Sequence, residues 1–158
     1  MQCARTIFSI AMFLCLAPAL TAAGPLQEDL KARRSRAMEG LGSGTLAIFW
    51  SAPIRVYSRD IDYEYRQDSN LLYLTGIDQE ETILVLMPGN ESRKEILFVR
   101  EADARREHWN GHSVTHAEAT AQSGIRTVMT MGQFDGFIAA MLSKRPMDGN
   151  PTEYTAFF

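Results

Sequence analysis

Residues 82–99, T-I-L-V-L-M-P-G-N-E-S-R-K-E-I-L-F-V, hold the pattern that decides the fold. Two apolar runs, Thr82–Met87 and Glu95–Val99, flank a segment that begins with Pro88-Gly89-Asn90. Short runs rich in β-branched and aliphatic residues, separated by Pro, Gly and Asn, are typical of paired strands. The stretch therefore predicts a β-hairpin with a longer loop.

The segments before this hairpin predict a helix and two further strands. Leu26–Leu41 repeats its apolar and long side chains at spacings of three and four, which predicts an amphipathic helix. Thr45–Trp50 is a continuous apolar run and predicts a buried strand. We expect a second strand at Leu71–Thr75, ended by Gly76.

The segments after the hairpin alternate between helix and strand patterns. Polar residues 101–108 and 115–122 predict short helices, 125–129 predicts a strand, and 132–143 predicts a helix. The last of these carries one apolar stripe, made of Phe134, Phe137, Ile138, Met141 and Leu142. This order of elements predicts an α/β fold with a mixed β-sheet flanked by helices.

Length and composition are those of an ordinary globular domain. The chain has 158 residues, of which 46% are hydrophobic and 22% charged, and its formal net charge is −3. One domain is expected at this length. A weakly acidic chain with no basic run argues against nucleic acid as the main partner.

Residues 1–23 are predicted to be a signal peptide. Arg5 precedes an apolar run of about ten residues, which is too short to span a bilayer, and small residues precede Gly24. Cleavage after Ala23 would remove both cysteines, Cys3 and Cys15, so the mature chain would have no disulfide and no thiol. We expect an exported protein, periplasmic or secreted, that does not associate with the membrane after cleavage.

The densest polar segment is D-I-D-Y-E-Y-R-Q-D-S-N, residues 60–70. Its carboxylates, tyrosines and Arg66 could form a binding site, since the guanidinium suits bidentate contact with a carboxylate. The alternative is a structured surface loop in which Arg66 and Asp68 satisfy local backbone groups. We favour the loop, because charged loops are common at domain surfaces.

His108, His112 and His116 are spaced four residues apart and would share one face of a continuous helix, where they could bind zinc. Asn110-Gly111 breaks that helix, so a metal site is the weaker hypothesis. Trp109 stands beside the same turn and is either a contact residue or a cover for the sheet. Asn90-Glu91-Ser92 is a formal glycosylation motif that is frequent by chance.

Residues 63–76, Y-E-Y-R-Q-D-S-N-L-L-Y-L-T-G, carry the pattern Y-x-Y-R-Q-x-S-x-x-x-Y-L-T-G. This pattern resembles the N-terminal domain of Xaa-Pro aminopeptidases (aminopeptidase P). Arg33-Arg34, and L-F-V at 97–99 followed by H-W-N-G at 108–111, are similar to further segments of that family. The resemblance covers about residues 26–142.

The resemblance implies a creatinase/prolidase-type N-terminal domain over residues 24–158. In that family the chemistry belongs to a second, C-terminal domain, where two Asp, one His and two Glu hold two metal ions, usually Mn²⁺. Those ions would activate water to attack the peptide bond before proline. The C-terminal catalytic domain is absent from this sequence. We therefore expect a fragment of a hydrolase, a manganese metalloprotease, that is inactive alone.

The resemblance also implies roles for particular residues. Trp109 matches a tryptophan that can reach a neighbouring subunit's active site, and Asp60 matches an acidic residue of the same region. Both are predicted contacts for substrate or the neighbouring subunit, not catalysts, and Arg66 is expected to be structural. The implied partners are proline-containing peptides and, at full length, further copies in a homo-oligomer.

Two alternatives stay open. The chain could be a stand-alone, non-catalytic module for peptide binding or assembly, or a relative that acts on creatine or dipeptides, since prolidase and creatinase share this architecture. The apolar end, with Tyr154, Phe157 and Phe158, indicates either a chain that continues or a terminus that docks on the core.

Overall fold

The hairpin predicted from residues 82–99 lies at the centre of the molecule. Its strands are β4 (Ile83–Leu86) and β5 (Glu95–Val99). They pair antiparallel, with Ile83 opposite Phe98 and Leu86 opposite Glu95. Every residue of β4 is buried, as expected for a strand that is covered on both faces.

The hairpin belongs to a five-stranded mixed sheet of order β6-β5-β4-β1-β7. Strand β1 (Thr45–Trp50) is antiparallel to β4. Strand β6 (Val128–Thr130) runs parallel to β5, and β7 (Ala156–Phe157) runs parallel to the start of β1. In a computed structural model, the described residues are 24–143, 145 and 156–157, and the predicted signal peptide therefore lies outside them.

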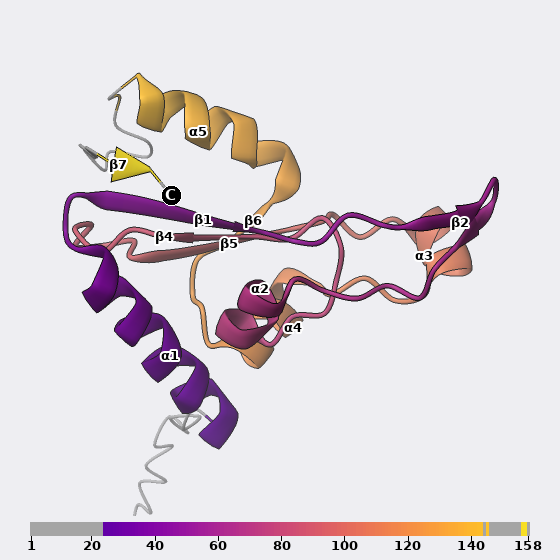
Figure 1. Cartoon of the computed structure of the whole chain (residues 1–158), viewed down its shortest axis with the longest axis horizontal. Helices are drawn as coiled ribbons and strands as arrows, with labels where there is room; N and C mark the ends of the chain where they lie inside the picture. Colours follow the sequence, from indigo (N-terminus) through magenta and orange to yellow (C-terminus); the bar gives the residue numbers. More distant parts are fainter. Residues whose placement is uncertain (1–23, 144, 146–155, 158) are drawn as a thin grey trace, which may run out of the picture.

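Helices cover both faces of this sheet (Figure 1). One face carries α1 (Pro25–Leu41), α2 (Ser69–Thr75) and α4 (His116–Ser123), and the opposite face carries α5 (Phe134–Leu142), which follows the 3₁₀ turn Met131–Gln133. The predicted fold class, α/β with a mixed β-sheet flanked by helices, is confirmed.

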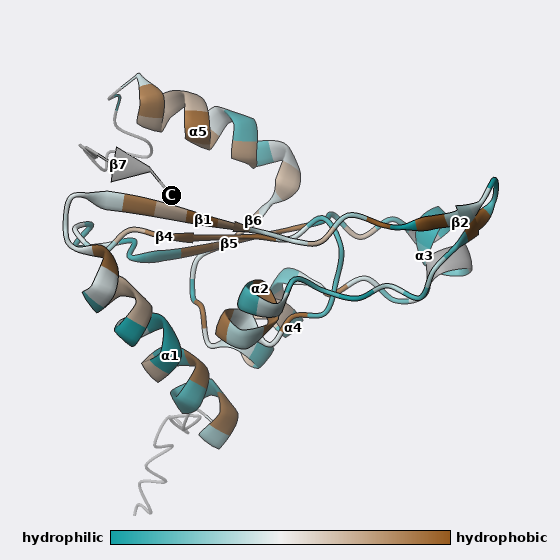
Figure 2. Cartoon of the chain, in the orientation of Figure 1, coloured by the Kyte–Doolittle hydropathy of each residue, from teal (hydrophilic) through white to brown (hydrophobic). Residues whose placement is uncertain are grey.

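Alternation along the central strands divides the core into two layers. Leu84 and Leu86 pack with the apolar faces of α1, α2 and α4. Ile83 and Val85 point to the other face and pack with α5. This period of two explains why the strands are apolar throughout: both sets of side chains are buried. Figure 2 shows the brown, hydrophobic sheet strands between the helical layers.

The strand predicted at Leu71–Thr75 is wrong, because these residues form helix α2. Asp68 caps the helix, its carboxylate accepting hydrogen bonds from the backbone N–H groups of Asn70 (2.9 Å) and Leu71 (3.1 Å). Gly76 ends it in the left-handed conformation, with φ +71°. A short apolar run fits a strand or a buried helix equally well, and here the two caps decide.

Smaller differences concern the ends of elements. The strand expected at 125–129 begins at Val128, while Ile125 is buried in the core. The helix expected at 115–122 is α4, one residue later, and Leu26 on α1 is exposed. Tyr154 and Phe158 lie outside the described residues. Within the described part, no helix is long and apolar enough to cross a membrane.

One pair of strands was not predicted from the sequence. Strands β2 (Val56–Ser58) and β3 (Ile61–Asp62) pair antiparallel as a separate two-stranded sheet. They project from the main sheet, and helix α3 (Ala104–Asn110) lies at the same end of the molecule (Figure 1). This end carries the predicted contact residues Asp60 and Trp109.

Candidate functional site

The two predicted contact residues lie at one end of the molecule. Asp60 is in the turn between β2 and β3, and Trp109 is in α3. Both elements extend beyond the end of β1 and away from the start of α1 (Figure 1). The described part of the structure includes the backbone of Trp109 but not its side chain. The fold therefore brings the two segments to one end, about 50 residues apart in sequence.

Residues 54–63 form a projecting hairpin, here called the hairpin arm. Its apolar side chains are exposed, and Tyr57 and Tyr63 stack edge to face with their ring centroids 5.1 Å apart. The turn residue Arg59 has a positive φ of 35°. The other exposed apolar members are Ile54, Val56 and Ile61. A cluster of exposed apolar residues on a folded domain is typical of a contact surface.

The base of the hairpin arm is fixed by one buried glutamine, Gln67. Its Oε1 accepts hydrogen bonds from the Ala52 N–H (3.1 Å), the Tyr65 hydroxyl (2.9 Å) and the Asp68 N–H (2.9 Å). Its Nε2 donates to the Gln79 carbonyl at 2.7 Å. Because Ala52 precedes the arm and Tyr65 follows it, Gln67 joins both ends of the arm to the domain.

Arg66, the predicted structural residue of this segment, is exposed. Its neighbours Gln67 and Asp68 make the hydrogen bonds that fix the arm and cap α2. Of the two residues in the loop interpretation, Asp68 thus has the expected role of satisfying backbone groups.

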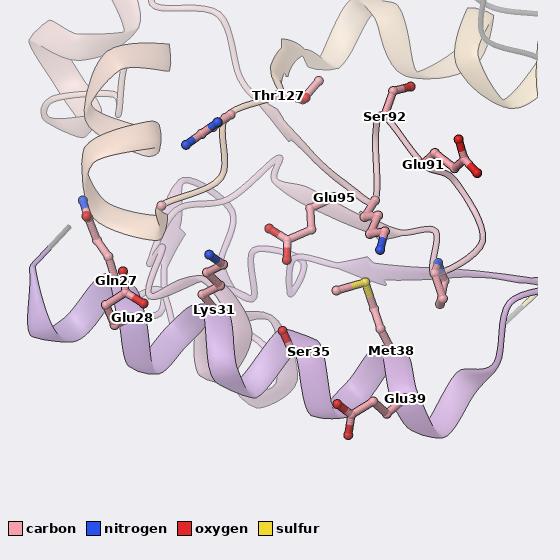
Figure 3. A pocket seen from close by; sticks show the side chains of 14 residues that line it. Gln27, Glu28, Lys31, Ser35, Met38, Glu39, Glu91, Ser92, Glu95 and Thr127 are labelled. Atoms are coloured by element: carbon pink, nitrogen blue, oxygen red, sulfur yellow. The ribbon is translucent and has the colours of Figure 1, made fainter. Parts of the chain in front are cut away.

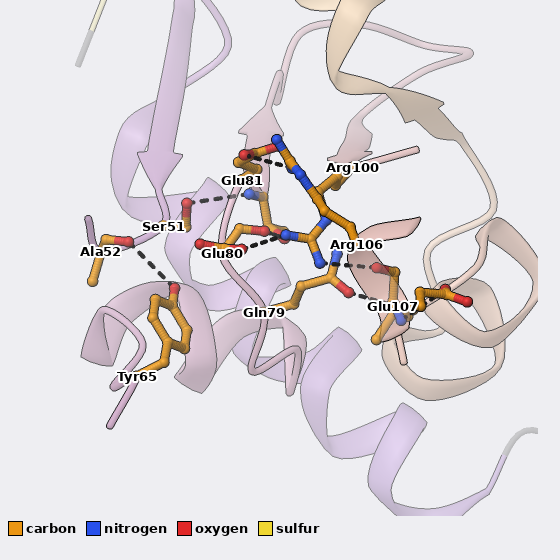
Figure 4. A network of polar contacts seen from close by, with 12 residues as sticks. Ser51, Ala52, Tyr65, Gln79, Glu80, Glu81, Arg100, Arg106 and Glu107 are labelled. Carbon is orange, nitrogen blue, oxygen red and sulfur yellow. Dashed lines mark hydrogen bonds and ion pairs between the residues drawn. The ribbon is translucent and has the colours of Figure 1, made fainter. Parts of the chain in front are cut away.

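A second polar cluster joins the end of β5 to the loop before β4 (Figure 4). Arg100 is buried; its Nη1 pairs with Glu80 and its Nη2 donates to the Ser113 hydroxyl at 2.8 Å. The Ser113 N–H donates to Glu107 of α3 at 3.0 Å. A more exposed pair, Arg106 with Glu81, adds a contact of 3.0 Å. These contacts hold α3 near the carboxyl end of β5.

The electrostatics of this end keep Tyr65 protonated. Partial burial, followed by the nearby carboxylates of Asp78 and Glu80, raises the pKa of the Tyr65 hydroxyl to about 12. The hydroxyl is therefore a hydrogen-bond donor to Gln67 throughout the neutral range, and it does not act as a base there.

The three histidines do not share a helix. His108 lies in α3, His112 in the following loop and His116 at the start of α4. The His112 Nε2 is 2.9 Å from a carboxylate oxygen of Glu118. Among the residues that the structure describes, no group of three or more His, Cys, Asp and Glu is placed to hold a metal ion. Asn90 of the formal glycosylation motif is buried, and its side chain accepts the Arg93 N–H at 2.8 Å.

A groove of about 750 Å³ lies at the opposite end of the sheet, between α1, the β4–β5 turn and the loop before β6 (Figure 3). Side chains of both signs line it, including Lys31, Lys94, Glu28 and Glu91. Met38 and Pro88 also line it, but charged side chains of both signs make it differ from the usual, predominantly apolar small-molecule pocket. The hairpin end is therefore the stronger candidate for a functional surface.

Comparison with known proteins agrees with this architecture. Residues 30–147 match the family model described as aminopeptidase P, N-terminal domain. Human Xaa-Pro aminopeptidase 3 is 34% identical over 110 residues, which cover 67% of this chain and 22% of the human protein. The Dictyostelium discoideum protein of the same name is 30% identical over 127 residues, covering 80% of this chain and 24% of that protein.

Solved structures give the same result. Zinc-substituted Escherichia coli aminopeptidase P in complex with product matches with a TM-score of 0.66 and 26% identity, over 71% of this chain and 26% of that one. The fold is thus the mixed-sheet α/β domain that forms the N-terminal part of these peptidases. The chain belongs to the aminopeptidase P N-terminal domain family. It spans about a quarter of the length of these relatives.

Asp60 and Trp109 were predicted from the sequence, but the residues that support their segments were not. Gln67 and Arg100 fix the hairpin arm and α3, and neither was singled out for a role of its own. Gln67 does stand inside the quoted family pattern, which was a usable signal. For Arg100, a charged residue that directly follows a buried strand was the available signal.

Proposed function

We propose that this chain is the N-terminal domain of an exported Xaa-Pro metalloaminopeptidase, which releases N-terminal residues that precede proline. In this proposal the chain supplies contacts at the active-site mouth and between subunits, and hydrolysis belongs to a dinuclear metal domain outside it. The observation that carries the proposal is the hairpin arm. Exposed Tyr57 and Tyr63 flank Asp60 on a hairpin that Gln67 fixes at its base.

In this proposal the metal ions are bound by the catalytic domain, which lies outside this chain. The described residues offer no set of donors that fits Mn²⁺. Residues of this chain would instead orient a proline-containing peptide or a neighbouring subunit. An acidic side chain such as Asp60, carried on an exposed turn, suits contact with a peptide's positively charged amino terminus.

The first experiment reads the DNA past the Phe158 codon. Where the reading frame continues, the longer product is compared with this 158-residue chain. A fluorogenic peptide with an N-terminal Xaa-Pro bond reports hydrolysis, with and without added Mn²⁺. Hydrolysis by the longer product alone supports the proposal. A stop codon after Phe158, with peptide binding but no cleavage, supports the stand-alone module instead.

The second experiment tests the residues in the longer product. Asp60→Asn and Trp109→Ala are each expected to lower kcat/KM at least about tenfold, the loss expected for one good polar or aromatic contact in a site. Asp135→Asn, an exposed carboxylate on α5, is the matched control and keeps full activity. Unchanged kcat/KM in both test variants would remove these residues from the site.

Export and assembly have their own readouts. Mass analysis of the protein recovered outside the cytoplasm is expected to show a chain that begins at Gly24. Sedimentation of the longer product is expected to show a homo-oligomer that Tyr57→Ser and Tyr63→Ser together weaken, because those exposed rings belong to the proposed contact surface. A full-length N-terminus or a concentration-independent monomer would contradict these parts.

A further inference from the structure

His112 lies between two carboxylates from different helices. Its Nε2 is 2.9 and 3.1 Å from the two carboxylate oxygens of Glu118, at the start of α4. Its Nδ1 is 3.7 Å from Glu107 Oε1, on α3. Neutral imidazole carries a proton on only one ring nitrogen, whereas the cation carries one on each. The arrangement therefore suits protonated His112, whose two ring N–H groups can each face one of the carboxylates.

Both carboxylates are held by other groups. Glu118 closes the capping box of α4, where it accepts from the Thr115 N–H at 2.8 Å and the Thr115 hydroxyl at 2.9 Å. Glu107 accepts the Ser113 N–H, and Ser113 in turn accepts from Arg100 at the end of β5. The two partners of His112 thus stand at fixed positions on opposite sides of the short loop after α3.

The described side chains of helix α3 are held by polar contacts. Of the α3 side chains that the structure describes, none is buried: Arg105, Arg106 and His108 are exposed and Glu107 is half-buried. The helix ends at Gly111, whose φ of +83° turns the chain toward His112. Segments with few buried contacts open at low free-energy cost, so the polar contacts of Glu107 contribute to holding the described part of this helix.

We propose that protonated His112, in the loop after α3, is a pH-dependent clasp that joins Glu107 of α3 to Glu118 at the amino end of α4. Loss of its proton removes one of the two ring N–H donors and the attraction to both carboxylates. The charged groups that face the ring are Glu107 from α3 and Glu118 from α4, and Arg100 stands behind them through Ser113. The clasp is closed when His112 is a cation and open when it is neutral.

The direction of the pH dependence follows from the same contacts. The hydrogen bond to Glu118, and then the charges of Glu118 and Glu107, raise the pKa of His112 above its ordinary value of 6.5. Its stabilising effect is therefore fully present below pH 6.5 and is lost as the pH rises through the higher folded-state pKa. Bonds from Thr115 and His112 hold the pKa of Glu118 at about 2, so Glu118 stays charged across this range.

The clasp exists independently of the proposed peptidase function, but its consequence for activity rests on that function, because α3 carries Trp109. The closing experiment therefore uses no activity assay. Amide hydrogen exchange of residues 104–115 is measured in the 158-residue chain at pH 6 and above pH 8, corrected for the intrinsic pH dependence of exchange. The imidazole of His112 is titrated by NMR in the same samples.

Protection of 104–115 is expected to fall roughly threefold between the two pH values, the size typical of an exposed charged contact. His112→Gln is expected to show the lower protection at both pH values, and His112→Arg, which keeps the cation, the higher protection at both. His116→Gln, an exposed histidine on α4, is the matched control and behaves like the unaltered chain. The exchange protection of the β4 amides is measured in every sample as a check that the core is intact.

Two results would overturn the clasp. One is a His112 imidazole that titrates at or below 6.5. The other is a change in 104–115 protection with pH that His112→Gln leaves as large as in the unaltered chain. The NMR titration needs no variant, so the first result stands even where a substitution disturbs folding.

Discussion

The guanidinium of Arg34 and the carboxylate of Glu95 form an ion pair beneath α1, with Arg34 Nε 3.1 Å from Glu95 Oε2. Arg34 is fully buried, and its Nη1 also donates to the backbone carbonyls of Leu74 (2.9 Å) and Ser123 (3.1 Å). Those carbonyls lie at the carboxyl ends of α2 and α4, where a cation is favourable. One side chain of α1 thus ties two helices and strand β5 together.

Arg34→Met is expected to lower the free energy of unfolding by about 3 kcal/mol, the usual cost of breaking a buried ion pair. The loss leaves Glu95 without its cation and two helix ends without a donor. Urea unfolding of the 158-residue chain measures it, with Arg36→Met, an exposed arginine on the same helix, as the control. Equal midpoints for the two variants would show that the buried pair contributes nothing net.

The cap of α2 can be tested in the same way. Asp68→Ala removes the acceptor for two backbone N–H groups at the start of the helix and is expected to destabilise the chain by about 1 kcal/mol. Glu64→Ala, an exposed carboxylate in the preceding loop, is the control and changes stability by less than about 0.5 kcal/mol. A stability for Asp68→Ala equal to that of the control would mean that the α2 cap is dispensable.

Local patterns were sufficient for most of the fold. Strands β1 and β5 begin and end where the sequence predicts, because the helices cover both faces of the sheet and keep most of their residues apolar; Trp50, at the end of β1, is exposed. Residues 71–75 were wrongly predicted as a strand from their apolar composition. They form a helix because Asp68 caps its start and Gly76 ends it. Caps of this kind are visible in sequence, but an apolar run of five residues has no periodicity to weigh against them.

The candidate site was predictable only in part. Asp60 and Trp109 were selected through the family pattern, and the fold carries both segments to one end. The hairpin arm was missed because its strands, Val56–Ser58 and Ile61–Asp62, are too short to show an alternation of apolar and polar residues. Gln67 reaches Ala52 and Gln79, 15 and 12 positions away in sequence, and Arg100 reaches Ser113 and Glu80, 13 and 20 positions away. Such distant pairings arise only once the sheet has formed.

Tyr65 gives a prediction at alkaline pH. Because its pKa in the folded chain is about 12 against an ordinary 10.0, the stabilisation it gives is complete below pH 10 and is lost as the pH rises to 12. A phenolate absorbance titration is expected to show one tyrosine that ionises last, and Tyr65→Phe to remove that step. Tyr73→Phe, an exposed ring, serves as the control and leaves the late step in place.

Two glycines with opposite surroundings give the last prediction. A Cβ at Gly89, in the β4–β5 turn, would overlap the backbone carbonyl oxygen of Ser43 and lie 3.0 Å from its carbonyl carbon. A Cβ at Gly136, inside α5, would meet nothing within 4 Å. Gly89→Ala must therefore move the turn away from the loop that leads into β1, at a cost of about 2 kcal/mol.

Gly136→Ala instead gains about 0.5–1 kcal/mol, because alanine loses less backbone entropy than glycine when a helix forms. Urea unfolding of both variants gives the comparison, and the two changes are expected to have opposite signs. The pair separates a steric requirement from the general effect of replacing glycine. If Gly89→Ala were as stable as the unaltered chain, the close approach of the β4–β5 turn to Ser43 would not constrain this fold.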